Sequence, residues 1–217
     1  MIISLSVYAN DIYINQSGAT LDLDVLQDGQ NNTVGSSGTA SSVIGATTNL
    51  AITQIGSNNV MTFDVNGATY TGTYSVTGNS NNIDFNCDSG GSNSSCGTAT
   101  ASIVWVGSSN DIDIDIGETS SATSATVGIT GASGSDSNTI LGTIDGNSAI
   151  LTLSVNGDTN NFLVDIDGNG DSVGHTYIHT HTGSIADVDI TQSGIYDNMI
   201  TLTTSGDNHD IDIIQRD

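Results

Sequence analysis

The chain has 217 residues, of which 24 are acidic and one is a lysine or arginine, and its formal net charge is −23 at pH 7. Nucleic acid and anionic membranes are poor partners for such a chain, because like charges repel. No segment is long and apolar enough to insert into a membrane. The 26 glycines, the absence of proline and the regular placement of β-branched residues argue against a disordered acidic chain.

The first nine residues, MIISLSVYA, resemble the end of a signal peptide, with Val7 and Ala9 suitably placed for cleavage after Ala9. They lack a basic segment, and their apolar part is short. We interpret residues 1–9 as either a signal-peptide remnant or a first strand, and residues 10–217 as a single domain. An extracellular location, or one on a cell or virion surface, is expected.

From residue 10 onward, short runs alternate apolar and polar residues, and each run ends near a glycine. Ile12, Ile14 and Gln16 precede Gly18 at even offsets, and the same pattern precedes Gly29, Gly56, Gly67, Gly78, Gly107, Gly131, Gly157, Gly168 and Gly194. Strict alternation predicts a strand with one buried face. A glycine followed by Asn, Asp or Ser predicts a turn that accepts a positive φ.

Two such strands with their turns form a unit of about 22–29 residues, a length typical of stacked coils. With no helix between the strands, the sequence predicts an all-β fold. This fold is a β-solenoid of about eight strand–arc–strand coils that form two stacked parallel sheets. Longer half-repeats are expected to form Gly/Ser/Thr insert loops around residues 33–46, 88–99, 117–124, 132–139 and 169–176.

Amide side chains recur at fixed places in this pattern. Five glutamines share the parity of the buried residues: Gln16, Gln27, Gln54, Gln192 and Gln215. Five asparagines stand three positions after a glycine: Asn32, Asn59, Asn81, Asn110 and Asn160. In stacked coils an inward amide can bond to the amides above and below it. We therefore predict a core amide ladder built from these ten residues.

The alternation with Gln, Gly and Asn is clearest in LAITQIGSNN (50–59) and VDITQSGIYDN (188–198). It resembles the curlin repeat of bacterial curli fibre subunits. The periodicity covers most of the chain, but the full signature is confined to its outer quarters. In the middle, the glutamine position is taken by Val65, Val76, Trp105, Ile129, Val155 or Ile166. The resemblance implies a divergent curlin-like solenoid with a more apolar interior, similar to chains found in marine bacteriophages.

The two cysteines, Cys87 and Cys96, flank a Gly/Ser-rich loop, CDSGGSNSSC. This spacing is sterically easy to bridge, and a disulfide is favoured in an exported protein. Two unpaired thiols are the alternative.

Most aspartates have the outward parity, so stacking brings their carboxylates close together. They form either a solvated face that limits lateral aggregation or calcium sites. The candidate calcium ligands are Asp111, Asp113, Asp115, Asp167 and Asp171. The last two lie in DGNGDSVGH (167–175), which faintly resembles the calcium-binding nonapeptides of secreted toxins.

The histidines gather in HTYIHTHTG, where His175, His179 and His181 share one parity with Tyr177. Two imidazoles two residues apart on a strand, such as His179 and His181, can chelate zinc. An exposed polar stripe is the other interpretation.

No GxSxG, HExxH or GxxxxGK[ST] motif occurs, and we expect a protein that is not an enzyme. The terminal strands share an Ile-x-Ile-x-Gln pattern, in Ile12 and Ile14 at one end and Ile211 and Ile213 at the other. Open solenoid edges of this kind favour a head-to-tail homo-oligomeric filament, a structural fibre outside the cell. The alternative is a non-polymerising adhesion or binding module on a virion or cell surface that presents its insert loops.

Overall fold

A computed structural model describes residues 11–216 apart from short gaps at 30, 36–39, 57, 79, 88–95, 108, 118–123, 132–136, 147, 157–158, 168–174, 184 and 207. The interpretation of residues 1–9, the interiors of most expected insert loops and Asp171 lie outside the described residues. Within them every regular element is a β-strand, and hence no helix there is long and apolar enough to cross a membrane.

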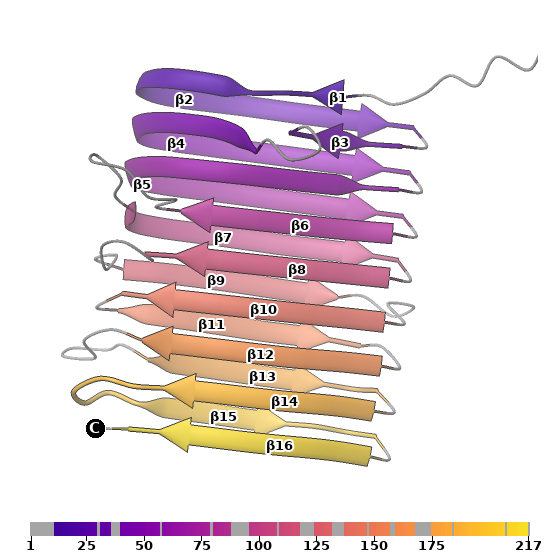
Figure 1. Ribbon diagram of the computed structural model, residues 1–217, viewed down its shortest axis with the longest axis vertical. Coiled ribbons are helices and arrows are strands. Elements are labelled where there is room, and N and C mark those ends of the chain that lie inside the picture. Colours follow the sequence, from indigo (N-terminus) through magenta and orange to yellow (C-terminus); the bar gives the residue numbers. More distant parts are fainter. Residues whose placement is uncertain are drawn as a thin grey trace, which may run out of the picture.

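The strands stack in two rows, and each strand is parallel to its neighbours in the row (Figure 1). The first row contains β1 (Asp11–Ile12) with the start of β2 (Asn15–Asp28), β3 (Thr33–Val34) with the start of β4 (Ser41–Ile55), the start of β5 (Val60–Thr77), β6 (Ser80–Cys87), β8 (Ser109–Ile116), β10 (Ser137–Asp145), β12 (Thr159–Asp167), β14 (Ile185–Gln192) and β16 (Asn208–Gln215). The second row contains the ends of β2, β4 and β5, then β7 (Cys96–Val106), β9 (Ser124–Gly131), β11 (Ala149–Val155), β13 (Thr176–His181) and β15 (Met199–Thr203).

The chain alternates between the two rows, and each circuit adds one strand to each row. This is a β-solenoid, and the predicted all-β fold class is confirmed. β2, β4 and β5 run around the arc from the first row into the second without a break, which joins the rows into one continuous sheet. Later circuits break at the arc, so their two strands are separate elements.

The alternation in the sequence determines which side chains are buried. In β7, for example, Ala101, Ile103 and Trp105 are buried, and the residues between them are exposed. The inward side chains of both rows meet in one apolar core that runs the length of the solenoid. Full burial of such a side chain contributes about 1.5–3 kcal/mol, so the core accounts for most of the stability of the coils.

Large core side chains are accommodated by glycines in neighbouring positions. Gly131 follows Trp105 in the second row, and a Cβ on Gly131 would lie 2.5 Å from the Trp105 ring. Tyr70 stacks on Phe85 with ring centroids 4.9 Å apart, and its hydroxyl is hydrogen-bonded to that of Tyr74. A Cβ on the intervening Gly72 would overlap the Tyr70 hydroxyl. Volume is therefore balanced between adjacent positions, as close packing requires.

Candidate functional site

The asparagines lie in one buried column at the corner where the chain passes from the second row to the first. We call this corner, formed by residues 29–32, 56–59, 78–81 and 107–110 and their equivalents, the glycine corner. The column contains, in order, Asn32, Asn59, Asn81, Asn110, Asn138 and Asn160. Asn59 Nδ2 donates to Asn32 Oδ1 over 2.9 Å, and Asn81 Nδ2 donates to Asn110 Oδ1 over 2.5 Å.

The rest of the column continues in the same way, from Asn110 Nδ2 to Asn138 Oδ1 (2.9 Å) and from Asn138 Nδ2 to Asn160 Oδ1 (2.6 Å). The direction of donation reverses between Asn59 and Asn81, whose Oδ1 atoms are buried without a hydrogen bond. The ladder thus consists of two hydrogen-bonded runs. Because each buried amide would lose its solvation without a partner, each run favours coils stacked at this spacing.

Asn138 is a member of this column that the glycine rule misses. It stands seven residues after Gly131, whereas its equivalent Asn160 stands five residues after Val155, so this connection is two residues longer. The distance to the following strand is the better signal. Every asparagine of the column stands two positions before the first inward apolar residue, as Asn138 stands before Ile140 and Asn110 before Ile112.

The corner glycines are required by close approach between coils. A Cβ on Gly78 would lie 1.9 Å from the carbonyl oxygen of Gly56 and 2.0 Å from Asn59 Oδ1. On Gly107 it would lie 1.7 Å from the carbonyl oxygen of Gly78. Neither Gly78 nor Gly107 has a positive φ, whereas Gly194 does, at 122°. At Gly78 and Gly107 it is therefore steric contact with the neighbouring coil, and not a positive φ, that excludes a side chain.

The glutamines form two separate pairs in place of one ladder. In the second row, Gln54 Nε2 donates to Gln27 Oε1 over 2.7 Å. In the first row, at the other end of the solenoid, Gln215 Nε2 donates to Gln192 Oε1 over 3.3 Å. Gln16 stands beside Val43. The ten amides predicted as one core ladder therefore occupy three separate columns.

Several of these glutamines also donate to backbone carbonyls of a neighbouring segment. Gln27 Nε2 donates to Thr33 over 2.8 Å, Gln54 Nε2 to Val60 over 3.1 Å, and Gln192 Nε2 to His175 over 2.7 Å. These bonds tie the end of one strand to a backbone carbonyl of another segment, which fixes the path of the chain around the corner.

The first row begins and ends with the same inward residues. One column runs from Gln16 through Val43, Val65, Cys87, Ile116, Ile144 and Ile166 to Gln192 and Gln215. A parallel column runs from Ile12 at one end to Ile211 at the other. Ile14 and Ile213 are the ends of the column between these two. The predicted edge residues Ile12, Ile14, Ile211 and Ile213 thus occupy equivalent positions at opposite ends.

Both ends leave strand edges open within the described residues. β16 pairs only with β14, β15 only with β13, and β2 only with β4. Apolar side chains at these ends are less covered than their equivalents further in. Ile213 is 44% exposed, whereas Ile190, its partner in β14, is 1% exposed. The open edges therefore expose both unpaired backbone groups and part of the core.

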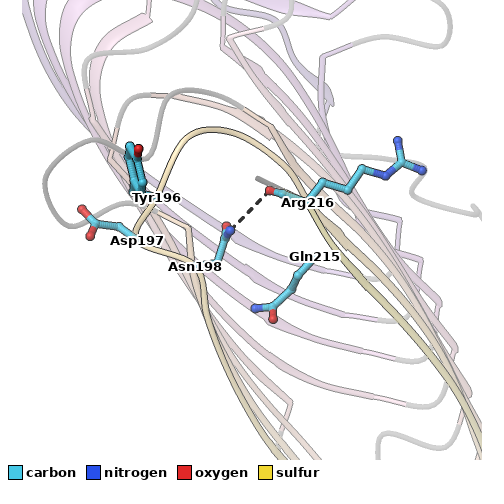
Figure 2. A pocket seen from close by; sticks show the side chains of 5 residues that line it. All are labelled: Tyr196, Asp197, Asn198, Gln215 and Arg216. Atoms are coloured by element: carbon cyan, nitrogen blue, oxygen red, sulfur yellow. Dashed lines mark hydrogen bonds between the residues drawn. The ribbon is translucent and has the colours of Figure 1, made fainter.

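A polar hollow lies beside the last strand (Figure 2). It has a volume of about 490 Å³ and is lined by Tyr196, Asp197 and Asn198 from the arc before β15 and by Gln215 and Arg216. Tyr196 and Asp197 have positive φ values of 68° and 62°, and Tyr196 is 68% exposed. Asn198 Nδ2 donates to the backbone oxygen of Arg216 over 3.4 Å, and the Arg216 side chain points away from Tyr196 and Asp197.

The histidines point into the core, so the expectation of an exposed polar stripe is wrong. Pairing of β13 with β11 places Tyr177 beside Leu151, His179 beside Leu153 and His181 beside Val155. His175, His179 and His181 are all buried. The alternation in the sequence does predict this burial. His179 and His181 stand four and two positions before Gly183, the same even offsets at which buried residues precede other corner glycines.

His179 is the centre of this buried group. Its Nδ1 is 2.9 Å from the Tyr177 hydroxyl, its ring meets Phe162 edge-on at 5.0 Å, and its Nε2 has no hydrogen-bond partner. Burial, and then the nearby His181 and His209, lower the pKa of His179 to about 4. His181 Nε2 lies 2.6 Å from Asn160 Nδ2, and its ring meets that of His209 at 5.6 Å. These rings therefore continue the core beyond the asparagine column.

The four described candidate calcium ligands lie on β8 and β12 of the first row. Asp111, Asp113 and Asp115 alternate along β8, and Asp113 is paired with Asp84. Partial burial, followed by the charges of Asp64 and Asp111, raises the pKa of Asp84 above its usual value. Asp167 is paired with Asp145 and accepts a hydrogen bond from Ser193 Oγ over 2.6 Å. Within the described residues, no three His, Cys, Asp or Glu side chains are placed to hold a metal ion.

The structure joins Cys87 and Cys96 in a disulfide. Cys87 ends β6 in the first row and Cys96 begins β7 in the second, so the bond crosses the arc within one circuit. Both residues are buried, and Cys87 continues the column of Val65 and Ile116.

Comparisons with protein-family models, with curated proteins and with solved structures give no match to this chain.

Proposed function

We propose that the protein is a non-enzymatic structural subunit that polymerises end to end through its open strand edges into an extracellular, curlin-like fibre. The observation that carries this proposal is the equivalence of the two ends. Ile12, Ile14 and Gln16 stand at one end of the columns that Ile211, Ile213 and Gln215 complete at the other.

A second copy fits this arrangement without a change of register. If β16 of one copy stacks on β1 and the start of β2 of the next, isoleucine meets isoleucine twice and Gln215 meets Gln16. Such a contact uses different surfaces on the two copies and does not close on itself, which generates a filament. It would cover the exposed Ile213 and satisfy the unpaired backbone groups of both edges.

Charge opposes this stacking. The same register places Asp210 against Asp11, extending the existing pair of Asp210 with Asp187. Two carboxylates about 5 Å apart repel by about 1 kcal/mol in water, and salt screens this repulsion. Calcium ions bridging the carboxylates would add attraction. Assembly should therefore strengthen with NaCl or Ca²⁺ and weaken in dilute buffer with a chelator.

The edge itself is tested by a matched pair of variants, because Ile213 and Ile214 are both 44% exposed. Ile213 has the inward parity and would be covered by the next copy, whereas Ile214 points outward. Ile213→Ser is expected to raise the protein concentration needed for fibres by about tenfold, and Ile214→Ser by less than about threefold. The concentration needed for fibres is measured by pelleting and by negative-stain images. The buffer contains about 1 M NaCl, which screens the repulsion between aspartates. Equal effects of the two variants would contradict stacking at this edge.

The hollow beside Tyr196 favours the alternative, an adhesion or binding module. An exposed aromatic ring next to carboxylate and amide groups is a surface suited to polar ligands such as glycans. A chain that remains monomeric at high salt and with Ca²⁺ would support this function in place of the fibre.

A further inference from the structure

The aspartates of the strands are concentrated on one of the two outward sides of the solenoid. In the first row, β6, β8, β10, β12, β14 and β16 each carry at least one outward aspartate, as in Asp84 of β6 and Asp189 of β14. In the second row, the described outward side chains from β4 to β15 carry no charge. β2, at the end of that row, is the exception, with Asp22, Asp24 and Asp28.

We call this uncharged surface the second-row face. It consists of the outward side chains in residues 47–55, 69–77, 98–106, 124–130, 150–154, 176–180 and 199–203. Threonine and serine predominate there and form rows across the strands, as in Thr71, Thr100 and Thr126, which are neighbours in β5, β7 and β9. Val104 and Val106 of β7 are each 40% exposed.

The shape of the second-row face suits contact with another sheet. Its strands stay nearly parallel to one another along the stack (Figure 1). Threonine, serine and valine have similar sizes, so their side chains form a level surface with a repeat of about 4.8 Å from strand to strand. Such a surface is buried most completely against a second sheet with the same repeat, because rows of side chains then meet matching rows.

Charge makes a second copy of this chain the partner that fits the second-row face. Each copy has a formal net charge of −23, which opposes close contact between copies. Contact through the outward side of the first row would set aspartates against aspartates. Contact through two second-row faces brings no charged side chains of these strands together. This is therefore the side on which two copies approach with the least repulsion.

The second-row face is also large enough for a stable contact. It spans seven strands, which at about 4.8 Å between strands and about seven residues per strand give a flat area of about 34 by 23 Å, or about 800 Å² per copy. Two copies would bury about 1,600 Å², the standard size of a specific protein–protein interface.

We propose that two copies of the chain pack against each other through their second-row faces. The copies run in opposite directions along the stack, so β4 of one copy faces β15 of the other and each β2 lies beyond the end of the opposite face. Copies running in the same direction would instead set Asp22 and Asp24 against their equivalents. β9 is the fourth of the seven strands and faces β9 of the second copy. The contact has two-fold symmetry and closes as a pair.

This contact goes beyond the proposed end-to-end assembly, because it uses a different surface from the open strand edges. It pairs single chains, and where filaments form it joins two of them side by side. Repetition along the filaments strengthens the pairing, since each further contact is made between partners already held together. A pair of filaments has twice the mass per length of one filament, and its acidic first rows face outward on both sides.

Thr126 and Thr143 provide a matched test in the full chain, because both are exposed strand residues and the same substitution changes the net charge equally. Thr126 lies on β9 in the second-row face, and Thr143 lies on β10 in the first row. Thr126→Lys is expected to weaken pairing by about 100-fold or more, since two ammonium groups would be buried against each other. Thr143→Lys should change it by less than about threefold.

Sedimentation of the soluble chain measures the pairing. In about 1 M NaCl, which screens the repulsion between copies, the wild type and Thr143→Lys should have twice the 22.1 kDa mass of one chain, and Thr126→Lys should have the mass of one chain. The circular dichroism spectrum and thermal unfolding of both variants should show that they remain folded.

The two-fold symmetry predicts a rescue. Thr126→Asp alone should be as monomeric as Thr126→Lys. An equimolar mixture of the two should regain dimers, because the ammonium group of one copy then faces the carboxylate of the other. A mixture of Thr126→Lys with Thr143→Asp is the control, and it should pair no better than Thr126→Lys with the wild type.

The outcomes separate this inference from the proposed function. A wild-type chain that stays monomeric at about 10 μM, where an interface of this size should hold, would overturn the pairing, as would dimers of Thr126→Lys equal to those of the wild type. Binding of a monomeric chain to a neutral surface such as ice or a polysaccharide, lost in Thr126→Lys, would also overturn it by giving the face another partner.

Fibres made of single filaments would overturn the pairing and leave end-to-end assembly standing. Dimers that form no fibre with NaCl or Ca²⁺ would support the pairing and overturn the proposed function. Dimers that are lost in Thr126→Lys, kept in Thr143→Lys and restored in the mixture are the result we expect.

Discussion

Glycine and asparagine act as a pair at two corners of the solenoid, those of Gly78 and Gly107. Asn81 and Asn110 each donate through Nδ2 to the carbonyl of the glycine three residues earlier, Gly78 and Gly107, over 3.2 Å. The same glycines lie directly against the glycine of the neighbouring coil. The asparagine therefore holds the corner in shape, and the glycine lets the next corner approach it.

The corner contact predicts the effect of a single methyl group. Gly78→Ala would place Cβ 1.9 Å from the Gly56 carbonyl oxygen, so neighbouring coils must separate, and we expect a loss of about 3 kcal/mol or more in the free energy of unfolding. Gly128→Ala is the control, because no atom lies within 4 Å of its added Cβ and β9 continues through it. That variant should be neutral or more stable by up to about 1 kcal/mol. Urea denaturation measures both, and equal losses would refute the corner contact.

The buried histidine predicts a stability that falls with acidity. The pKa of His179 is lowered to about 4 from the 6.5 of an exposed histidine. As pH falls from about 6.5 to about 4, the unfolded chain binds a proton that the folded chain does not, so the free energy of unfolding decreases. Below about 4 both states are protonated, and this residue causes no further loss. We expect a decrease of about 3 kcal/mol from this residue over the whole range.

Aspartates also titrate near this pH range. The contribution of His179 to the loss in the free energy of unfolding is therefore measured as a difference between two variants. The reference is Tyr177→Phe, which keeps His179, and the comparison is Tyr177→Phe with His179→Leu, which removes the imidazole without leaving the tyrosine hydroxyl unpaired. Denaturation at pH 7 and pH 4.5 should show the larger decrease in the reference. Identical pH dependence would mean that folding does not lower the pKa of His179.

At the scale of the strands, alternation in the sequence was sufficient to predict the architecture. Runs of alternating apolar residues before a glycine became strands with the expected inward face, as in Ala101, Ile103 and Trp105. Parallel stacking of such strands then determined the position of the asparagine column, because asparagine keeps a constant distance from the strand that follows it.

The glutamine columns were less predictable, since their membership depends on the row that each half-repeat enters. Gln16, Gln192 and Gln215 end segments of the first row, whereas Gln27 and Gln54 end segments of the second. Local spacing does not distinguish the rows, because a glycine follows the first-row segments of β2 and β5, at Gly18 and Gly67, just as one follows their second-row segments, at Gly29 and Gly78. Pairing between distant strands supplies this information.

The disulfide acts at the scale of one circuit, linking β6 to β7 across residues 88–95. A loop of about ten residues closed by a disulfide adds about 2–3 kcal/mol in the chain-entropy estimate. Cys87→Ala with Cys96→Ala should therefore lower the free energy of unfolding by about this amount. The reduced wild-type chain should show a similar loss in urea denaturation. An unchanged free energy of unfolding on reduction would indicate that the disulfide does not stabilise the fold.

At the scale of the whole molecule, the acidic exterior and the open ends have opposite effects. The 24 acidic residues against one lysine or arginine keep chains apart, because their charges repel. The uncovered apolar side chains at both ends favour stacking. The balance between these two terms makes assembly dependent on ionic conditions, whereas the fold of each chain depends on its internal core and corner contacts.

The axial repeat of the filament tests end-to-end stacking most directly. Nine first-row levels about 4.8 Å apart give a repeat of about 43 Å for each chain. With a mass of 22.1 kDa for each chain, the filament should have about 0.5 kDa for each Å of length, given that spacing. Electron microscopy of fibres grown in high salt or Ca²⁺ should give this repeat and, for each filament, this mass per length. Fibres with a mass per length unrelated to one chain in about 43 Å, or discrete particles under all these conditions, would contradict the account.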